Sequence, residues 1–313
     1  MENKLLTDYE SIKFIDLFAG IGGTRLAFEN AGSNCVFSSE WDKFAQQTYM
    51  ANFGEIPKGD ITKISSNEIP DFDILVGGFP CQPFSSMGKR EGFKHKTQGT
   101  LFHDVARIIN DKKPKVFLLE NVPGLTTHED GKTFETVLNV LEEIGYKVFF
   151  KILNSADFGV PQRRRRIYIV GFEKNKFENI NFIFPTGNST SFINEFIEDD
   201  VKGFSISKHL QNSYIFKKND GHPQVIDKNS KIQVKTLVST YHKIQRITGT
   251  FVKGGETGLR LLSVNECKAI MGFPKEFKVP VSRTQMYRQF GNSVAVPVVE
   301  AIAKEIIKNL KKK

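Results

Sequence analysis

The segment that most constrains the fold lies near the N-terminus, where an apolar run passes through glycines into a helical pattern. Residues 12–18 predict a strand, residues 19–23 a glycine-rich turn, and residues 24–30 a helix capped by Thr24. Glycines let a ligand approach the backbone closely, and the N–H groups of a helix start point at it. The spacing is not that of the dinucleotide fingerprint. The segment therefore predicts a nucleotide-type cradle without naming its ligand.

Further apolar runs alternate with helical patterns through the first half of the chain. Strands are expected at residues 35–39, 74–76, 116–119 and 146–150, and helices at 101–110 and 133–144. This alternation is typical of an α/β fold with a doubly wound, mostly parallel sheet. In such sheets the ligands bind at the carboxyl ends of the strands.

Three of these strand ends carry residues suited to an adenosine-containing cofactor. Glu40 ends the second strand, where an acidic residue commonly holds the two ribose hydroxyls, and Trp41 could pack on an adenine. Asp60 and Ile61 form a turn that could contact the adenine, and Gly78 ends the next strand. Their common placement favours an adenosine cofactor.

Cys81 follows Gly78 closely and is the candidate nucleophile. Two glycines allow a tight turn before it, and Pro80 stiffens the preceding residue. A buried structural cysteine is the alternative, and it is the commoner role for a cysteine. The polar neighbours Gln82 and Ser85 argue against burial, so a nucleophilic thiol is favoured. The Gly- and Lys-rich stretch 85–99 is expected to be a basic lid over the substrate.

Glu120 ends the strand expected beside that of Cys81. Burial there would raise its pKa and let it act as an acid, whereas the alternative is a surface glutamate in a loop. Further on, four consecutive arginines, Arg163 to Arg166, lead into an apolar strand. Strand alternation places Arg164 and Arg166 on one face and Arg163 and Arg165 on the other. One pair can therefore line the cleft.

Composition limits the class of protein and its partners. The 313 residues carry a net charge of +9, which suits a polyanionic partner. No apolar run approaches a membrane span, and no signal peptide is expected. Three cysteines without a CxxC pair favour a reducing cytosol, and the six histidines lack ligand spacing, so no metal site is expected.

The pattern changes between residues 185 and 258, where short β-like runs with many Asn, Ser and Gly replace the alternation. Residues 201–260 hold eleven lysines or arginines and three acidic residues, a bias suited to phosphates. Arg246 could read guanine, and Gln245 adenine or another base. An ordinary polar loop is the equally weighted alternative for any single residue.

These elements, in this order, resemble the bacterial cytosine-C5 DNA methyltransferase family. The segments that carry the resemblance are residues 18–23, 80–82, 120–122, 162–166, 260–274 and 287–297. The resemblance implies a catalytic domain of residues 1–185 and 291–313 with the fold of S-adenosylmethionine-dependent methyltransferases. It also implies a smaller, β-rich target-recognition domain at residues 186–260, called the insert below, and a hinge at 261–290. A C-terminal helix over residues 298–310 should pack back on the large domain, as its apolar spacing independently indicates.

The resemblance also implies the residues that act. Cys81 adds to C6 of a flipped-out cytosine, Glu120 holds and protonates N3, and Arg166 contacts O2 with Arg164 beside it. The donor is S-adenosylmethionine and the product S-adenosylhomocysteine. The implied cofactor contacts are Phe18, Gly20, Gly23, Glu40, Trp41, Asp60, Ile61, Gly78, Pro80, Leu101, Asn292 and Ser293. The expected DNA contacts are Gln82, Ser85, Arg163, Thr236, Leu237, Tyr241 and Arg246.

The expected partner is double-stranded DNA, with no membrane and no metal, in the cytoplasm of a bacterium. By analogy the chain is a monomer, and a cognate restriction endonuclease could act separately. A tRNA cytosine methyltransferase is the nearest rival interpretation and an inactive DNA-binding protein the second. A nicotinamide oxidoreductase is a third rival, but the G-x-G-x-x-G fingerprint that it needs is missing from this sequence. The DNA sequence that is recognised cannot be derived from the residues.

Overall fold

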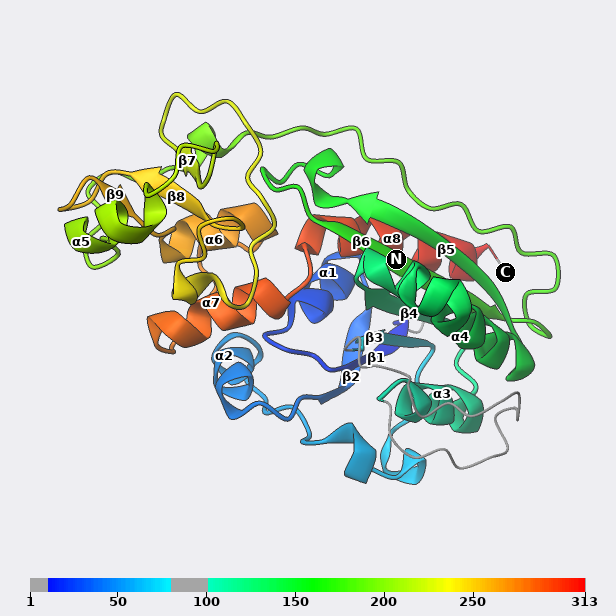
Figure 1. The fold of residues 1–313 in the computed structure, drawn as a ribbon. Helices are drawn as coiled ribbons and strands as arrows, with labels where there is room; N and C mark the ends of the chain where they lie inside the picture. Colours follow the sequence, from blue (N-terminus) through cyan, green and yellow to red (C-terminus); the bar gives the residue numbers. More distant parts are fainter. Residues whose placement is uncertain (1–10, 80–100, 313) are drawn as a thin grey trace, which may run out of the picture.

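The computed structural model describes residues 11–79 and 101–312, whose strands form one large and one small sheet (Figure 1). The large sheet has the order β2-β1-β3-β4-β6-β5. Pairing is parallel from β2 through β4 and antiparallel between β4, β6 and β5. The predicted doubly wound, mostly parallel sheet is confirmed. Its strands are β1 (Lys13–Leu17), β2 (Asn34–Ser39), β3 (Ile74–Gly78), β4 (Val116–Asn121), β5 (Tyr146–Asn154) and β6 (Arg165–Glu173).

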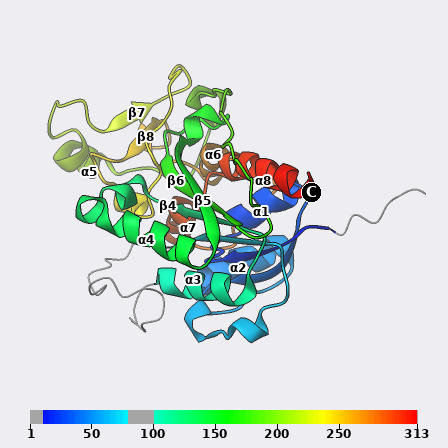
Figure 2. The ribbon, with the colours of Figure 1, turned by 90° about the vertical axis from the view of Figure 1, so that its right-hand side faces the viewer.

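Helices cover both faces of this sheet, as the two views show (Figures 1 and 2). Phe14 of β1 belongs to the hydrophobic core on the side of α1 (Gly23–Asn30) and α8 (Val296–Lys311). Its neighbour Ile15 belongs to the core on the side of α3 (Leu101–Lys112) and α4 (Lys132–Glu143). Because successive side chains of a strand point to opposite faces, a strand buried on both faces is apolar at most positions, and the buried Asp16 is the exception in β1. The helices are α1 (Gly23–Asn30), α2 (Lys43–Phe53), α3 (Leu101–Lys112), α4 (Lys132–Glu143), α6 (Val264–Met271), α7 (Arg283–Asn292) and α8 (Val296–Lys311).

The start of α1 differs from the sequence-based expectation. Thr24 was expected to cap the helix, but the cap residue is Gly22, with φ 86°. A left-handed backbone conformation at this point costs a glycine little, so the helix begins one residue before Thr24. The C-terminal helix is confirmed: α8 buries Val298, Ile302 and Ile306 in the core.

The small sheet lies in the insert and has the order β7-β8-β9. Its strands are short: β7 (Gln224–Ile226), β8 (Thr250–Lys253) and β9 (Leu259–Arg260). Most of the remaining insert consists of turns and short helical segments, among them α5 (Lys208–Leu210) and the π-helical turn Gln211–Ile215. So few strand residues cannot form a separate core of the usual kind.

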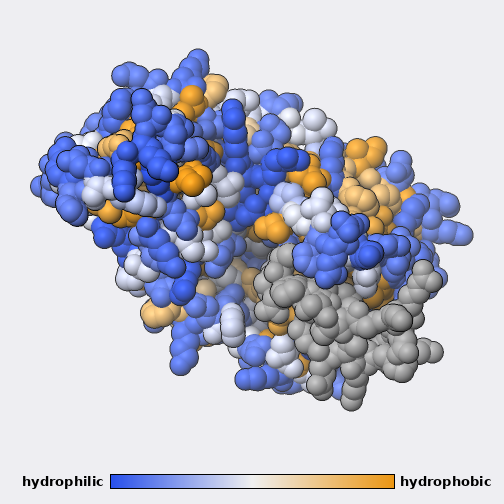
Figure 3. All heavy atoms as spheres, viewed as in Figure 1, coloured by the Kyte–Doolittle hydropathy of each residue, from blue (hydrophilic) through white to orange (hydrophobic). Residues whose placement is uncertain are grey.

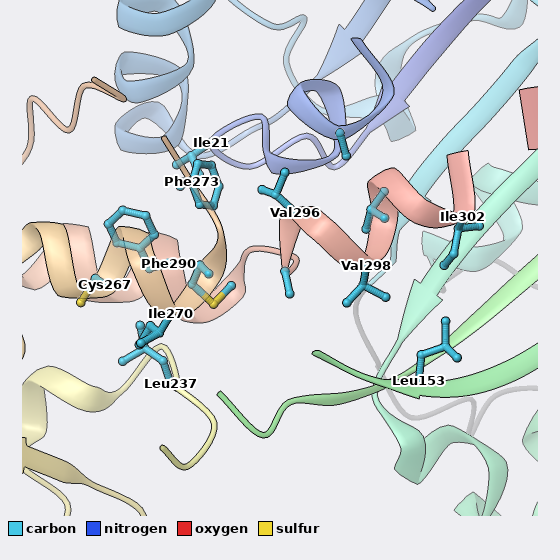
Figure 4. Packing of buried hydrophobic residues seen from close by; sticks show 14 of the residues in the cluster. Ile21, Leu153, Leu237, Cys267, Ile270, Phe273, Phe290, Val296, Val298 and Ile302 are labelled. Carbon is cyan, nitrogen blue, oxygen red and sulfur yellow. The ribbon is translucent and has the colours of Figure 1, made fainter. Parts of the chain in front are cut away.

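The insert instead packs on the core of the α1 and α8 side. Leu237 of the insert lies with Ile270 of α6 and Phe290 of α7 in one buried cluster that continues to Val298 of α8 (Figure 4). This shared core holds the two parts of the molecule in a defined relative position. The surface of the insert is largely hydrophilic in the view of Figure 3.

Candidate active site

The glycine-rich turn after β1 has an unusual backbone. Phe18 has φ 56°, Gly20 φ 55° and Gly22 φ 86°, so three residues within five adopt left-handed conformations. For a bulky residue such as Phe18 this conformation costs about 1–3 kcal/mol, and such strain clusters at functional sites. The turn is therefore built for close approach of a ligand.

Glu40 connects this turn to the end of β2. Its side chain is buried, Oε2 accepts the Gly20 N–H at 2.8 Å, and Oε1 accepts the Asp42 N–H at 2.8 Å. Burial raises the pKa of Glu40, and these backbone N–H groups oppose the shift. Trp41, the next residue, is 77% exposed. A buried carboxylate thus lies beside an uncovered aromatic ring, as an adenosine site requires.

Two more expected cofactor residues lie close to the end of β2. The Glu40 N–H donates to the carbonyl of Lys58 at 2.7 Å, which brings the following residues alongside. Asp60 caps a short helical turn by accepting the Thr62 N–H at 3.1 Å, and Ile61 is buried. This loop therefore forms a second wall at the same sheet edge.

The segment after α7 reaches the same turn from the other end of the chain. A Cβ at Gly23 would lie 2.7 Å from Oγ of Ser293 and 3.0 Å from the ring of Phe273. Only a glycine allows α1 and residue 293 to approach this closely. Ser293 and its neighbour Asn292 are thereby brought to the cofactor turn. Leu101, the first residue of α3, is half-buried.

Glu120 lies near the end of β4, next to Gly78 of β3 in the parallel register. Nε of Arg166 is 3.0 Å from Oε1 of Glu120. Burial raises the pKa of Glu120, and the charges of Arg166 and Arg164 oppose that rise. A Cβ at Gly78 would lie 3.2 Å from Oε2 of Glu120. The carboxyl group of Glu120 therefore lies between Gly78 of β3 and Arg166 of β6, and the arginine charges offset part of the rise that burial causes in its pKa.

Asn121 belongs to this site although the sequence analysis did not single it out. Its buried side chain donates from Nδ2 to the carbonyl of Phe79 at 3.0 Å. Phe79 is the last described residue before Pro80 and Cys81. Asn121 thus ties the strand of Glu120 to the segment that leads to the thiol. The feature of the sequence that could have identified Asn121 is its position next to Glu120 at the end of a strand.

The arginine run alternates as predicted, because Arg163 and Arg165 are exposed while Arg164 is buried. Arg164, however, does not line an open cleft. Its guanidinium donates to the carbonyls of Leu237 at 3.1 Å, Gly291 at 3.1 Å and Ser293 at 2.6 Å. Burial and the neighbouring Arg166 lower the pKa of Arg164 to about 10. Arg164 therefore joins the insert and the closing segment to β6.

Two expected DNA contacts of the insert lie against this run. Thr236 donates from Oγ1 to the carbonyl of Arg163 at 2.7 Å. The Leu237 N–H donates to Oε1 of Gln162 at 2.6 Å, and Gln162 is fully buried. Gln162, which the sequence analysis placed only in the arginine motif, thereby aligns the insert with β6.

Two other expected DNA contacts face the interior of the insert. Tyr241 is buried, and its hydroxyl donates to the carbonyl of Thr250 at 2.5 Å. Arg246 is 8% exposed, and its guanidinium bonds to carbonyls and to Asp220. The expectation that Arg246 reads guanine does not fit this arrangement, because its donors are already used within the insert. The same groups that can read a base also satisfy buried carbonyls.

Four expected site residues, Pro80, Cys81, Gln82 and Ser85, and the expected lid at 85–99, lie outside the described residues. In residues 11–79 and 101–312 no group of three or more His, Cys, Asp or Glu is placed to bind a metal ion. Within the same ranges, no helix has the length and apolarity needed to cross a membrane.

Comparison with known proteins agrees with this geometry. The family model for C-5 cytosine-specific DNA methylases matches residues 12–308. The type II methyltransferase M.MspI of Moraxella sp. is 61% identical over 300 residues, covering 96% of this chain and 71% of that protein. M.BsuFI of Bacillus subtilis is 60% identical over 294 residues, covering 93% and 71%.

Solved structures share the fold at much lower identity. The Entamoeba histolytica methyltransferase EhMeth has a TM-score of 0.75 at 22% identity, covering 96% of this chain and 99% of that one. A putative DNA modification methyltransferase from an Escherichia coli prophage has a TM-score of 0.74 at 21% identity, covering 96% and 100%. With the family model spanning nearly the whole chain, this protein belongs to the C-5 cytosine-specific DNA methylases and is a DNA (cytosine-5-)-methyltransferase.

Proposed function

We propose that this enzyme transfers a methyl group from S-adenosylmethionine to C5 of a cytosine flipped out of a short duplex sequence, through a covalent bond between Cys81 and C6. The contact that supports this most is the pair of Glu120 and Arg166, 3.0 Å apart at the end of β4. It lies beside β3, whose chain continues to Cys81. The proposed domains are residues 1–185 with 291–313, the insert at 186–260, and the hinge at 261–290.

The residues at the sheet edge fit S-adenosylmethionine. Glu40 offers a buried carboxylate for the ribose hydroxyls, and exposed Trp41 a ring for the adenine. The left-handed turn at Phe18 and Gly20 supports close approach of the backbone. When bound, this cofactor supplies a methyl group on a positively charged sulfur. Asp60, Ile61, Gly78, Pro80, Leu101, Asn292 and Ser293 would complete the pocket.

The reaction needs a cytosine whose C5 has become electron-rich. The Cys81 thiolate adds to C6 while Glu120 gives its proton to N3, which leaves an enamine with nucleophilic C5. Arg166 can hold the cytosine O2 and at the same time orient Glu120. After methyl transfer, loss of the C5 proton to a base expels the thiolate from C6, and N3 returns its proton to the Glu120 carboxylate, which restores the neutral aromatic ring. Arg164 supports this site by bonding to backbone carbonyls and is better described as a positioning residue.

The cytosine must leave the duplex to reach this site, at a cost of a few kcal/mol. We propose that Gln82, Ser85, Arg163 and Thr236 contact the opened DNA and that modification protects the DNA from a restriction endonuclease. The names of M.MspI and M.BsuFI as type II methyltransferases support this last step.

The test is to incubate the purified enzyme with S-adenosylmethionine and unmethylated plasmid and to sequence the DNA after bisulfite treatment. Protected cytosines at one recurring short motif are expected, and Cys81→Ala should protect none while still binding the plasmid. Lack of protection by the wild-type enzyme, with cofactor binding confirmed, would contradict the proposal.

A further inference from the structure

We propose that the loop at residues 216–223 of the insert binds a backbone phosphate of the DNA duplex, and that Arg246 is a positioning residue that holds this loop in shape. The inference rests on the proposed function, because it takes duplex DNA as the substrate. It assigns to Arg246 a role different from the base reading expected from the sequence.

Arg246 bonds to four residues of one short segment. Nε donates to the carbonyl of Ile215 at 2.9 Å, and Nη2 to the carbonyls of Lys218 at 2.9 Å and His222 at 3.0 Å. Nη1 donates to Oδ2 of Asp220 at 2.9 Å, while Nη2 donates to Oδ1 of the same carboxylate. A planar guanidinium with its donors fixed in a fork can set the path of a loop in this way.

The clamped loop borders a hollow of about 570 Å³ that opens to solvent. Lys218, Asn219 and His222 are polar residues of its lining, and Lys217 beside them is exposed. The one carboxylate of the loop, Asp220, is paired with Arg246 and so repels an approaching anion less.

The proton position on His222 also favours an anion. Nζ of Lys235 lies 3.2 Å from Nδ1 of His222. An ammonium group only donates, so Nδ1 has to accept, and the proton of the neutral ring is then on Nε2. His222 is left with an N–H donor, and the Lys235 charge lies next to it. Both features suit a phosphate oxygen.

The loop is linked directly to the candidate active site. Lys235 bonds to His222, Thr236 bonds to the carbonyl of Arg163, and the carbonyl of Leu237 accepts from Arg164. A duplex that contacts Arg163 and Thr236, as proposed above, would therefore also meet this loop through the adjacent Lys235.

The test measures DNA binding of a double variant, Lys218→Ala with His222→Ala, in the presence of S-adenosylhomocysteine. The probe is a fluorescent duplex carrying the motif that bisulfite sequencing identifies. Loss of a phosphate contact should weaken binding about threefold to tenfold and reduce the slope of log K against log salt by about 1. The control is Lys174→Ala, an exposed lysine just beyond the far end of β6, which should change neither quantity.

Asp220→Asn tests the positioning role of Arg246. It removes a negative charge next to the DNA, so simple electrostatics predicts tighter binding. Loss of the clamp predicts weaker binding and a higher KM for DNA with little change in kcat. Arg246→Lys should weaken binding similarly although it keeps the charge, and thermal unfolding would show that both variants are folded.

Unchanged affinity and salt slope in the double variant, with normal methylation by the wild-type enzyme, would overturn the phosphate site. Tighter binding by Asp220→Asn would overturn the positioning role. Failure of the proposed function itself would show differently, since the wild-type enzyme would then protect no cytosine in plasmid DNA.

Discussion

Arg166 and Glu120 face each other from two neighbouring antiparallel strands, with Nε and Oε1 3.0 Å apart. Burial raises the pKa of Glu120, and the positive charge of Arg166 is the largest influence that opposes this rise. Burial therefore favours the protonated carboxyl group, which is the form that can act as an acid, while the arginine charge limits this effect. The pair therefore links the fold of β4 and β6 to the proposed acid chemistry.

Glu120→Gln should lower kcat by about 10²–10⁴, because an amide cannot donate a proton to cytosine N3 as a carboxylic acid does. Single-turnover methylation measures the effect, and S-adenosylmethionine affinity by calorimetry should not change. Glu135→Gln, on the exposed side of α4, is the matched control and should keep full activity. An unchanged rate for Glu120→Gln would remove this residue from the mechanism.

Arg166→Gln should move the pH profile. Removing the positive charge of Arg166, which opposes the effect of burial, raises the pKa of Glu120 further. Since the protonated form is the acid, the fall of kcat/KM on the alkaline side should shift to higher pH, while kcat itself decreases. An alkaline limb at the same pH in both enzymes would contradict the assignment of Glu120 as the acid.

Asn121→Ala should reduce methylation because it releases the Phe79 carbonyl just before the nucleophile segment. Leaving that buried carbonyl unpaired costs about 1–3 kcal/mol. The unfolding temperature measured by calorimetry and kcat should both decrease, and the covalent enzyme–DNA adduct should form more slowly. A variant that unfolds at a lower temperature but forms the adduct at the wild-type rate would show that Asn121 only stabilises the fold.

Gly291→Ala should weaken the joint between α7 and the insert. The added Cβ would lie 2.2 Å from the backbone N of Ser239 and 2.4 Å from the carbonyl carbon of Val238. Backbone has to move to make room, at a cost of about 1–3 kcal/mol in unfolding free energy. Gly124→Ala is the control, since nothing lies within 4 Å of its added Cβ. Equal melting temperatures for the two variants would argue against this close contact.

Asp16 should make stability depend on pH. Burial raises its pKa from 3.8 to about 8, and its Oδ2 is buried without a hydrogen-bond partner among the described residues. The folded state therefore holds a proton that the unfolded chain releases. Its contribution is complete below about pH 4 and is lost as the pH rises towards 8. Unfolding free energy measured in denaturant should fall over this range in the wild-type protein and less steeply in Asp16→Asn.

The features that could be predicted from sequence depend on neighbouring residues along the chain. Period-two alternation placed Arg163 and Arg165 on the face opposite to Arg164 and Arg166, and the structure confirms this, with Arg163 and Arg165 exposed and Arg164 buried. The helical spacing of Val298, Ile302 and Ile306 likewise predicted the buried face of α8. The chain order of strands and turns was enough to predict the fold class.

The sequence by itself determined which residues form strands, turns and helices, because these depend on local backbone preferences. It also placed glycines and carboxylates at the ends of strands, because their positions follow from the order of residues along the chain. Only the tertiary structure decided which partners the arginines take. Arg164 bonds to Gly291, 127 positions away, and Arg246 to Asp220, 26 positions away. A guanidinium serves equally well for DNA and for carbonyls, and packing of distant segments decides which of them it reaches.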